Sequence, residues 1–285
     1  MAAFILVSTC LSLACIDRSG SSSVATPEDG REDLSPNVGG QSAAEFGRLK
    51  ARPGGALQLG SGESGLRRLP LRGGNALLFI PPDHQGTKQA PFALELHGAG
   101  GNARGGIGPF LNAGPAGVIL LSVKSQGPTW DLLQGAKGSD VDFIDQALGY
   151  VFDHWKIDRS HLAVLGFSDG ASSALSLGIT NGDLFSHVVA LSPGFLKTER
   201  PRGHPHIFIG HGTHDEVLPM ESTSCQIAPR LQNEGYDVTL RVHDGGHNPR
   251  PMARSALSWF LDDEALATPE ESSNITRSSC LRARN

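Results

Sequence analysis

The stretch "HLAVLGFSDGASSALSLG" places a serine between two glycines, after an apolar run and before residues with helical spacing. Gly166, Ser168 and Gly170 here form the pattern G-x-S-x-G. On a sharp turn from a strand into a helix, such a serine presents its hydroxyl as a nucleophile, and glycines avoid collisions with the two elements. Ordinary Gly/Ser turns carry the same letters, so the motif alone leaves both interpretations open.

A serine nucleophile needs a base, and the base needs an orienting acid. The segment "FIGHGTHDEVLP" places Asp215 just past one predicted strand, and "VHDGGHNPR" places His247 in the loop after the next strand. His243 lies too close to its strand to reach across, and Asp244 lies on the wrong loop. Three residues in the order Ser, Asp, His at strand ends predict a catalytic triad of Ser168, Asp215 and His247.

The glycine-rich loop "LELHGAGGN" (94–102) follows an early apolar run. Small residues in such a loop let backbone N–H groups approach a carbonyl oxygen, so we expect an oxyanion hole from the N–H groups of Ala99 and Asp169. The alternatives are a plain glycine-rich loop or a phosphate-binding loop. The second is disfavoured because the G-K-[ST] ending is missing.

A dense group of metal-ligating residue types comprises His204, His206, His211, His214 and Asp215. His206 and His211 flank opposite ends of one predicted strand, which places them about 15 Å apart at about 3.3 Å per residue. Zinc requires imidazoles that converge at about 2.1 Å, so these two cannot share an ion. We therefore expect no metal and no other cofactor.

Seven short apolar runs, bounded by turn residues, alternate with helical patterns. The runs are 76–81, 92–97, 117–123, 161–166, 187–192, 206–211 and 237–242. Because most are apolar on both faces, they are typical of strands buried in a parallel sheet. Apolar residues at helical spacing predict helices over 141–155, 171–178 and 253–261, and Pro229 predicts a kinked or late-starting helix in 221–235. The pattern predicts an α/β fold with a mostly parallel central sheet flanked by helices.

The chain is predicted to divide into four parts. Residues 1–15 are apolar but too short to span a bilayer, and they read as a signal peptide or as a lipoprotein signal ending at Cys15. Residues 16–55 are rich in Ser, Gly and Pro and predict a flexible linker, whereas 56–264 form the folded domain and 265–285 a flexible polar tail. We expect an exported protein, secreted or held at the cell envelope through a lipid on Cys15.

The bulk composition sets limits on partners. A formal net charge of −5 gives no basis for binding nucleic acid, and the four cysteines form no CxxC pair. In an exported chain Cys225 and Cys280 could pair, but the position of Cys280 in the polar tail argues against this. The oligomeric state is left open.

Five segments resemble the phospholipase/carboxylesterase type of α/β-hydrolase, which are serine esterases with a minimal single-domain sheet. They are "HGAGGN", "GFSDGAS", "NGDLFSHVVALSPGF", "HGTHDEVLP" and "DGGH", within roughly 92–250. The resemblance implies Ser168 as nucleophile, Asp215 as acid and His247 as base. Many members carry Gln after the serine, where this chain has Asp169. Only the backbone N–H is needed there, but a carboxylate pointing inward would slow acylation.

The predicted reaction is hydrolysis of a small-molecule carboxylic ester through an acyl-enzyme. No insertion is long enough for a lipase lid, which favours small or exposed esters. Gly98, Gly100 and Trp130 are candidates for the substrate pocket, with a packed surface position as the alternative for Trp130. The same triad could also cleave a thioester, a polyester or a peptide, and a non-catalytic binding protein could retain the fold.

Overall fold

The computed structural model describes residues 47–54, 64–84, 88–115, 117–134, 138–198, 200–262 and 280. All of them belong to one compact unit, Gln41–Asn285. The predicted signal segment with Cys15, most of the predicted linker, and the tail apart from Cys280 lie outside the described residues.

Each of the seven predicted apolar runs overlaps a strand of the described residues, whereas the strand over 65–68 and the helices over 103–112 and 131–134 were not predicted. The strands are β1 (Gly65–Arg68), β2 (Ala76–Ile80), β3 (Ala90–Leu96), β4 (Ile119–Val123), β5 (Ile157–Phe167), β6 (His187–Leu191), β7 (His206–Gly212) and β8 (Val238–His243). The helices are α1 (Ala103–Asn112), α2 (Asp131–Gln134), α3 (Ser139–His154), α4 (Asp169–Thr180), α5 (Ser224–Asn233) and α6 (Arg250–Phe260). Helix α5 starts late, at Ser224, and contains Pro229.

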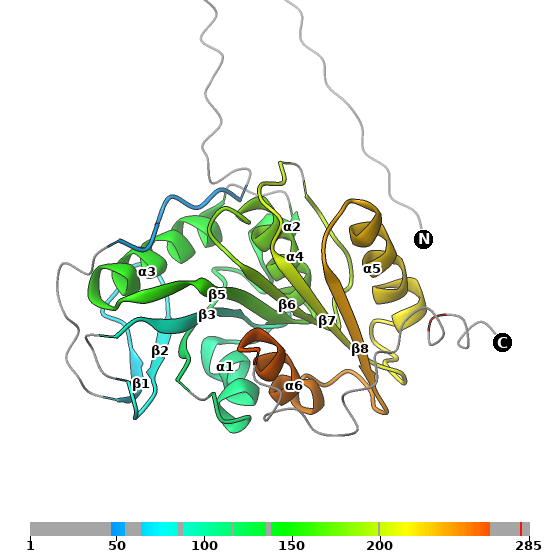
Figure 1. The fold of residues 1–285 in the computed structure, drawn as a ribbon, viewed down its shortest axis with the longest axis horizontal. Helices are drawn as coiled ribbons and strands as arrows, with labels where there is room; N and C mark the ends of the chain where they lie inside the picture. Colours follow the sequence, from blue (N-terminus) through cyan, green and yellow to red (C-terminus); the bar gives the residue numbers. More distant parts are fainter. Residues whose placement is uncertain are drawn as a thin grey trace, which may run out of the picture. The chain divides into compact units, whose positions relative to one another are not determined.

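The strands pair in the order β1-β2-β4-β3-β5-β6-β7-β8. In Figure 1, β5, β6, β7 and β8 follow one another across the sheet. The pairs β1–β2 and β2–β4 are antiparallel, and every later pair from β4 through β8 is parallel. All residues of β4 and β6 are buried, which is why apolar residues stand at consecutive positions rather than at alternate ones, with Ser122 and His187 as the polar exceptions. The prediction of a mostly parallel α/β sheet is confirmed.

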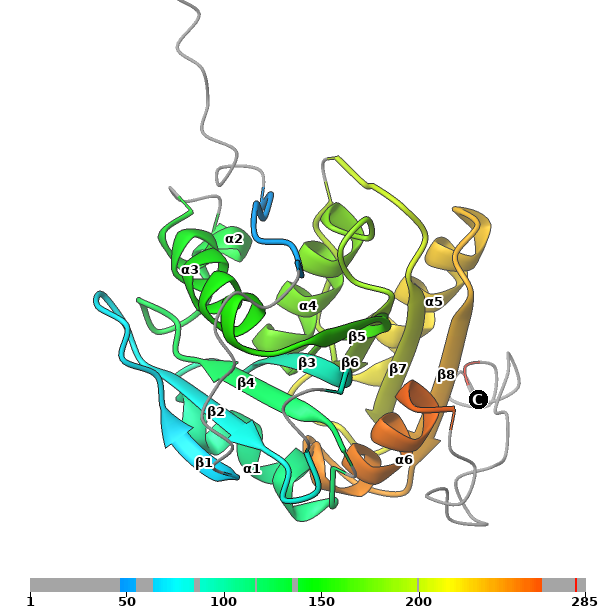
Figure 2. The same ribbon diagram turned by 60° about the vertical axis from the view of Figure 1, so that its left-hand side comes forward.

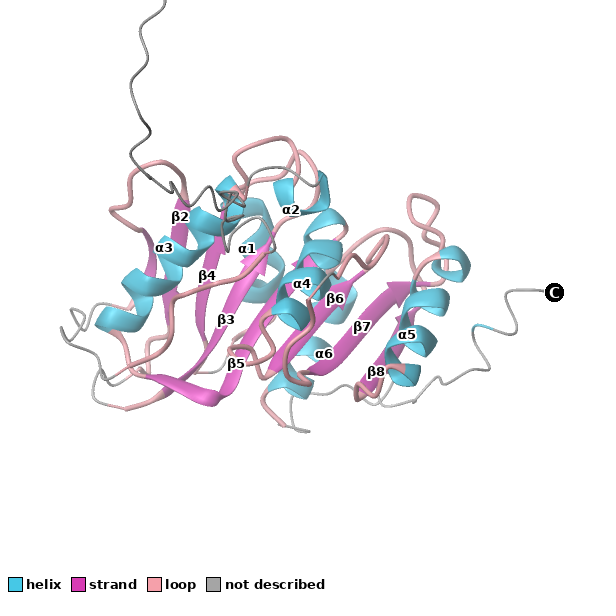
Figure 3. Cartoon of the chain, turned by 90° about the horizontal axis from the view of Figure 1, so that it is seen from above, coloured by secondary structure: helices cyan, strands magenta, loops and turns pink. Residues whose placement is uncertain are grey.

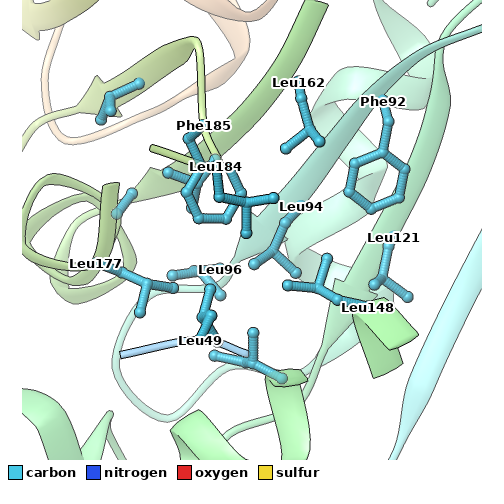
Figure 4. Close-up of a cluster of buried hydrophobic side chains, with 14 of the residues drawn as sticks. Leu49, Phe92, Leu94, Leu96, Leu121, Leu148, Leu162, Leu177, Leu184 and Phe185 are labelled. Carbon is cyan, nitrogen blue, oxygen red and sulfur yellow. The ribbon is translucent and has the colours of Figure 1, made fainter. Parts of the chain in front are cut away.

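Helices cover both faces of the sheet (Figures 2 and 3). On one face, α3, α4 and α5 build the larger apolar cluster, and on the other α1 and α6 build the smaller one. Figure 4 shows the larger cluster, in which Leu94 and Leu96 of β3 lie between Leu148 of α3 and Leu177 of α4. Each buried leucine contributes about 1.5–3 kcal/mol relative to an exposed one, so the two clusters fix the sheet and its carboxyl edge.

The predicted linker over 16–55 extends too far, because its last part packs on the domain. Leu49 is 2% exposed and joins the larger cluster (Figure 4). Its N–H donates to Asn181 Oδ1 over 2.9 Å, and Arg48 forms an ion pair with Asp183 at 2.8 Å. The average composition of the segment concealed one apolar anchor and its polar partners.

The expectation against a Cys225–Cys280 pair is wrong. The two residues form a disulfide, with Cα atoms 5.6 Å apart, within the usual range for such bonds. The bond ties Cys280 to the second residue of α5. A polar segment needs no apolar surface of its own to be fixed at one point, so tail composition was a poor guide to the pairing.

Candidate active site

Ser168 stands on the turn between β5 and α4 with φ 58° and ψ −123°, a strained backbone conformation for a residue with a side chain. The flanking glycines are required by close backbone approach. A Cβ on Gly166 would lie 2.2 Å from the Gly170 carbonyl oxygen, and one on Gly170 would lie 1.8 Å from the Leu96 carbonyl oxygen. The Ser168 N–H donates to Leu191 O of the neighbouring β6 over 2.9 Å, which fixes the turn against the sheet.

The structure brings together the three residues predicted to act on a substrate. His247 Nε2 lies 3.0 Å from Ser168 Oγ, and His247 Nδ1 lies 2.7 Å from Asp215 Oδ2. Asp215 follows β7 and His247 follows β8, so both reach Ser168 from the carboxyl edge of the sheet. The Phe167 ring packs against the imidazole of His247, with ring centroids 4.6 Å apart.

The carboxylate of Asp215 is fully buried and surrounded by donors. Its Oδ1 accepts from the N–H groups of Val217 and Leu218, at 3.0 and 2.9 Å. Burial on its own raises the pKa of Asp215, but hydrogen bonds from Leu218, His247 and Ser192 outweigh it and hold that pKa below its ordinary value. Asp215 is therefore ionised at neutral pH and can stabilise a charged imidazole.

Ser192 was missed by the sequence reasoning. It follows β6, is 2% exposed and adopts φ 51°, an uncommon conformation for a serine. Its side chain supports the Asp215 carboxylate. The only sequence signal was its place at the end of the apolar run 187–192, which is also the place of many structural serines.

The loop predicted to stabilise an oxyanion lies against the nucleophile. A Cβ on Gly98 would lie 3.2 Å from Ser168 Cβ, so any larger residue would crowd the serine. The loop is held by Gly101 N–H donating to Gly98 O over 3.0 Å. Among the described residues, the backbone hydrogen bonds of turns and loops include none donated by the N–H of Ala99 or of Asp169.

The Asp169 carboxylate has a partner outside the triad. Thr129 Oγ1 donates to Asp169 Oδ2 over 2.6 Å. One carboxylate oxygen is thus held by the loop that precedes α2. The carboxylate at this position therefore has Thr129 as its hydrogen-bond donor.

A cavity of about 220 Å³ adjoins the same loop. It is lined by Gly98, Ala99, Gly106, Phe110, Phe167 and Pro249, among others. Gly98 was a predicted pocket residue, but Gly100 and Trp130 do not line this cavity. The N–H of Gly100 donates to Pro128 O over 2.6 Å, and its φ of 66° makes it a turn residue.

Trp130 is neither a pocket wall at this cavity nor a surface residue. It is 2% exposed, and its Nε1–H donates to the His97 carbonyl oxygen over 2.8 Å. Its ring also packs on the His97 ring, with centroids 4.9 Å apart. A buried tryptophan is stable where its N–H has an acceptor, and here it supports the residue that begins the Gly-rich loop.

The dense group of histidines is divided among separate partners. His206 pairs with Asp237 at 2.9 Å and His214 pairs with Asp244 at 3.0 Å, whereas His211 lies 3.2 Å from Asp215. Within the described residues, no three metal-ligating side chains are arranged to hold an ion.

Glu95 is a second buried carboxyl group, on β3 below α1. Burial raises its pKa to about 8, against the smaller lowering by a hydrogen bond from Ser122. The Ser122 hydroxyl donates to Glu95 Oε2 over 2.5 Å, whereas Oε1 has no hydrogen-bond partner among the described residues. Glu95 lies outside the Ser168 site, and we assign it a structural role.

Comparison with solved structures identifies the architecture as an α/β-hydrolase fold. One similar structure is an S-formylglutathione hydrolase from Staphylococcus aureus, with a TM-score of 0.57 and 14% identity. The alignment covers 69% of this chain and 98% of that one, and at this identity it shows the fold alone.

Two sequence relatives support the resemblance to esterases of the phospholipase/carboxylesterase type. NocK of Nocardia uniformis subsp. tsuyamanensis, named as an esterase, is 28% identical over 53% of this chain and 48% of its own. Acyl-protein thioesterase 1 of Emericella nidulans is 31% identical over 37% of this chain and 48% of its own. The chain thus spans about half the length of the curated relatives it matches. No protein-family model matches it.

Proposed function

We propose that the protein is a serine hydrolase that cleaves carboxylic esters through an acyl-enzyme. The observation that carries this proposal is the continuous hydrogen-bonded row from Ser168 Oγ to His247 over 3.0 Å and from His247 to Asp215 over 2.7 Å. A side-chain row of this kind converts a weakly nucleophilic hydroxyl into an effective attacker at neutral pH.

The proposed reaction has two acyl-transfer steps. His247 Nε2 accepts the Ser168 proton as Oγ attacks the ester carbonyl, and it then protonates the leaving alcohol. Water attacks the acyl-enzyme with His247 again as base. Asp215 holds Nδ1–H and stabilises the imidazolium. The N–H groups of Ala99 and Asp169 donate to the oxyanion, and each such donor contributes about 3 kcal/mol.

The cavity beside the Gly-rich loop favours a compact apolar group on the substrate. Its wall combines the rings of Phe110 and Phe167 with Pro249, and at about 220 Å³ it fits a short acyl chain or a single ring. A thioester is the second candidate substrate, because one relative is named an acyl-protein thioesterase. Attack on the carbonyl carbon needs the same residues for an oxygen or a sulfur leaving group.

A panel of nitrophenyl esters and matched thioesters of increasing chain length tests the proposal. We expect hydrolysis by the wild type and its loss in Ser168→Ala. Ser173→Ala is the matched control, because Ser173 lies on α4, the helix that Ser168 precedes, and is 2% exposed with no partner for its hydroxyl among the described residues. Wild-type and Ser168→Ala proteins with equal rates would overturn the proposal.

We further propose that the chain is exported and that Cys15 carries a lipid. The apolar segment before Cys15 supports this. So does the Cys225–Cys280 disulfide, because such bonds persist in oxidising compartments. No helix within the described residues is long and apolar enough to span a bilayer. Intact-mass analysis of the exported protein, compared with a Cys15→Ser variant, would show a lipid-sized mass only in the former. Equal masses, corrected for the substitution, would refute the lipid.

A further inference from the structure

A second histidine contacts the carboxylate of Asp215. His211 is the sixth residue of β7, and its side chain and that of Asp215 are both fully buried. His211 Nε2 lies 3.2 Å from Asp215 Oδ2, the same oxygen that faces His247 Nδ1. The mechanism derived above gives this residue no task.

The contacts of His211 fix where its hydrogen lies. Nε2 is 2.8 Å from the carbonyl oxygen of Leu218, which can only accept, so Nε2 carries the hydrogen. Nδ1 is 2.7 Å from Ser224 Oγ, and in a neutral ring it accepts the hydrogen of that hydroxyl. Burial lowers the pKa of His211, and the opposing contributions of Leu218 O and of the Asp215 charge do not reverse this. The ring is therefore a neutral donor at Nε2.

That one N–H joins two parts of the turn that holds the acid. Leu218 N–H donates to Asp215 Oδ1, while the Leu218 carbonyl oxygen accepts from His211. His211 thus lies within reach of both ends of the turn. Backbone N–H groups hold the carboxylate from the Oδ1 side and His247 holds it from the Oδ2 side, with His211 Nε2 3.2 Å from Oδ2, so its rotation about χ2 is restricted.

We propose that His211 is a positioning residue, whose Nε2–H holds the Leu218 carbonyl oxygen and so fixes the turn that points Asp215 Oδ2 at His247 Nδ1. This inference rests on the proposed function. The substrate never meets His211, which acts only through Asp215. Ser224 at the start of α5 sets the ring in the orientation that makes this possible.

Two substitutions of similar polarity separate positioning from packing. In His211→Gln the side-chain amide reaches the place of Nε2 and can donate to Leu218 O. In His211→Asn the shorter amide reaches only the place of Nδ1 and Ser224. We expect kcat to fall about 10- to 100-fold in His211→Asn with KM nearly unchanged, because the buried Leu218 carbonyl loses its donor, and to recover in His211→Gln.

A spectroscopic signature decides the inference without relying on turnover. The His247 Nδ1–H proton held by Asp215 gives a far-downfield proton resonance. We expect it in the wild type and in His211→Gln, and we expect it to be shifted or broadened in His211→Asn. Ser224→Ala is a milder change that serves if His211→Asn does not fold. We expect it to shift the His247 resonance in the same direction. An unchanged resonance in both His211→Asn and Ser224→Ala would overturn the positioning role. A wild type that shows the resonance but cleaves no ester would instead refute the proposed function.

Discussion

In the Ser168 turn, Gly170 has the least room for a side chain, because the end of β3 lies against it. The substitution Gly170→Ala tests this close approach. A Cβ there would lie 1.8 Å from the Leu96 carbonyl oxygen and 2.6 Å from the His97 carbonyl oxygen. Because side-chain Cβ contacts below 3.0 Å essentially do not occur, the Leu96 oxygen would have to move from 1.8 to at least 3.0 Å, by about 1.2 Å. Both obstacles are backbone atoms, so neither can turn away as a side chain would.

The displacement has consequences for stability and for the site. Overpacking of a close-packed interior costs about 1–3 kcal/mol, and rigid backbone places this substitution at about 3 kcal/mol or above. The moved segment continues into the loop carrying Gly98 and Ala99, and a misplacement of about 1 Å there lowers kcat/KM about 100-fold.

Urea unfolding followed by circular dichroism, and kcat/KM on a nitrophenyl ester, measure the two effects of Gly170→Ala. Gly149→Ala on α3 is the matched control, because a Cβ at Gly149 meets nothing within 4 Å. We expect the control to keep full activity and to gain about 0.5–1 kcal/mol as a Gly-to-Ala change inside a helix. A Gly170→Ala protein whose unfolding free energy lies within about 0.5 kcal/mol of wild type would refute the close approach.

Three further perturbations have expected outcomes. The pKa of Glu95, raised to about 8, means that the folded state favours the neutral acid, so the stability of the protein falls as pH rises from about 4.5 through 8. Glu95→Gln should remove this fall. Equal melting temperatures of the variant and the wild type at pH 9 would contradict the prediction. The Cys225–Cys280 bond closes a loop of 55 residues, so the double substitution Cys225→Ser and Cys280→Ser should lower the free energy of unfolding in denaturant by up to about 4 kcal/mol. Reductant should lower the stability of the wild type by the same amount. A wild type whose stability does not change in reductant would count against the bond. Phe195 and Val217, 43% and 66% exposed, are the exposed large apolar side chains of the described region and lie after β6 and β7; replacing either with Ser should raise KM for long-chain esters but not for acetates, and parallel changes for both would exclude a substrate contact.

The sheet was predictable because its strands are apolar on both faces. β4 and β6 are apolar apart from Ser122 and His187, and the periodicity of α3 marked its buried face. The antiparallel direction of β2 was not predictable, since direction depends on the connection and not on local sequence. The packed segment 47–54 was missed because its few buried residues, Gly47, Leu49 and Pro53, lie within a polar composition.

The positions of the three site residues followed from motif order and strand ends, whereas the residues that hold them did not. His211 and Ser192 act through atoms that converge only in three dimensions, and each has the sequence surroundings of an ordinary core residue. Trp130 was assigned to the pocket from its residue type. Its side chain instead satisfies its N–H on the His97 carbonyl, a pairing between positions 33 residues apart that no local pattern encodes.

Covalent labelling with an organophosphonate, mapped by tandem mass spectrometry, tests the central claim most directly. The reagent reacts with a serine only when a base removes the hydroxyl proton and donors accept the developing charge. We predict a single phosphonyl group on Ser168 in the wild type, and none in a His247→Ala variant incubated for the same time. An unlabelled wild type, or a label that stays on Ser168 at the same rate without His247, would contradict the assignment of Ser168 as an activated nucleophile.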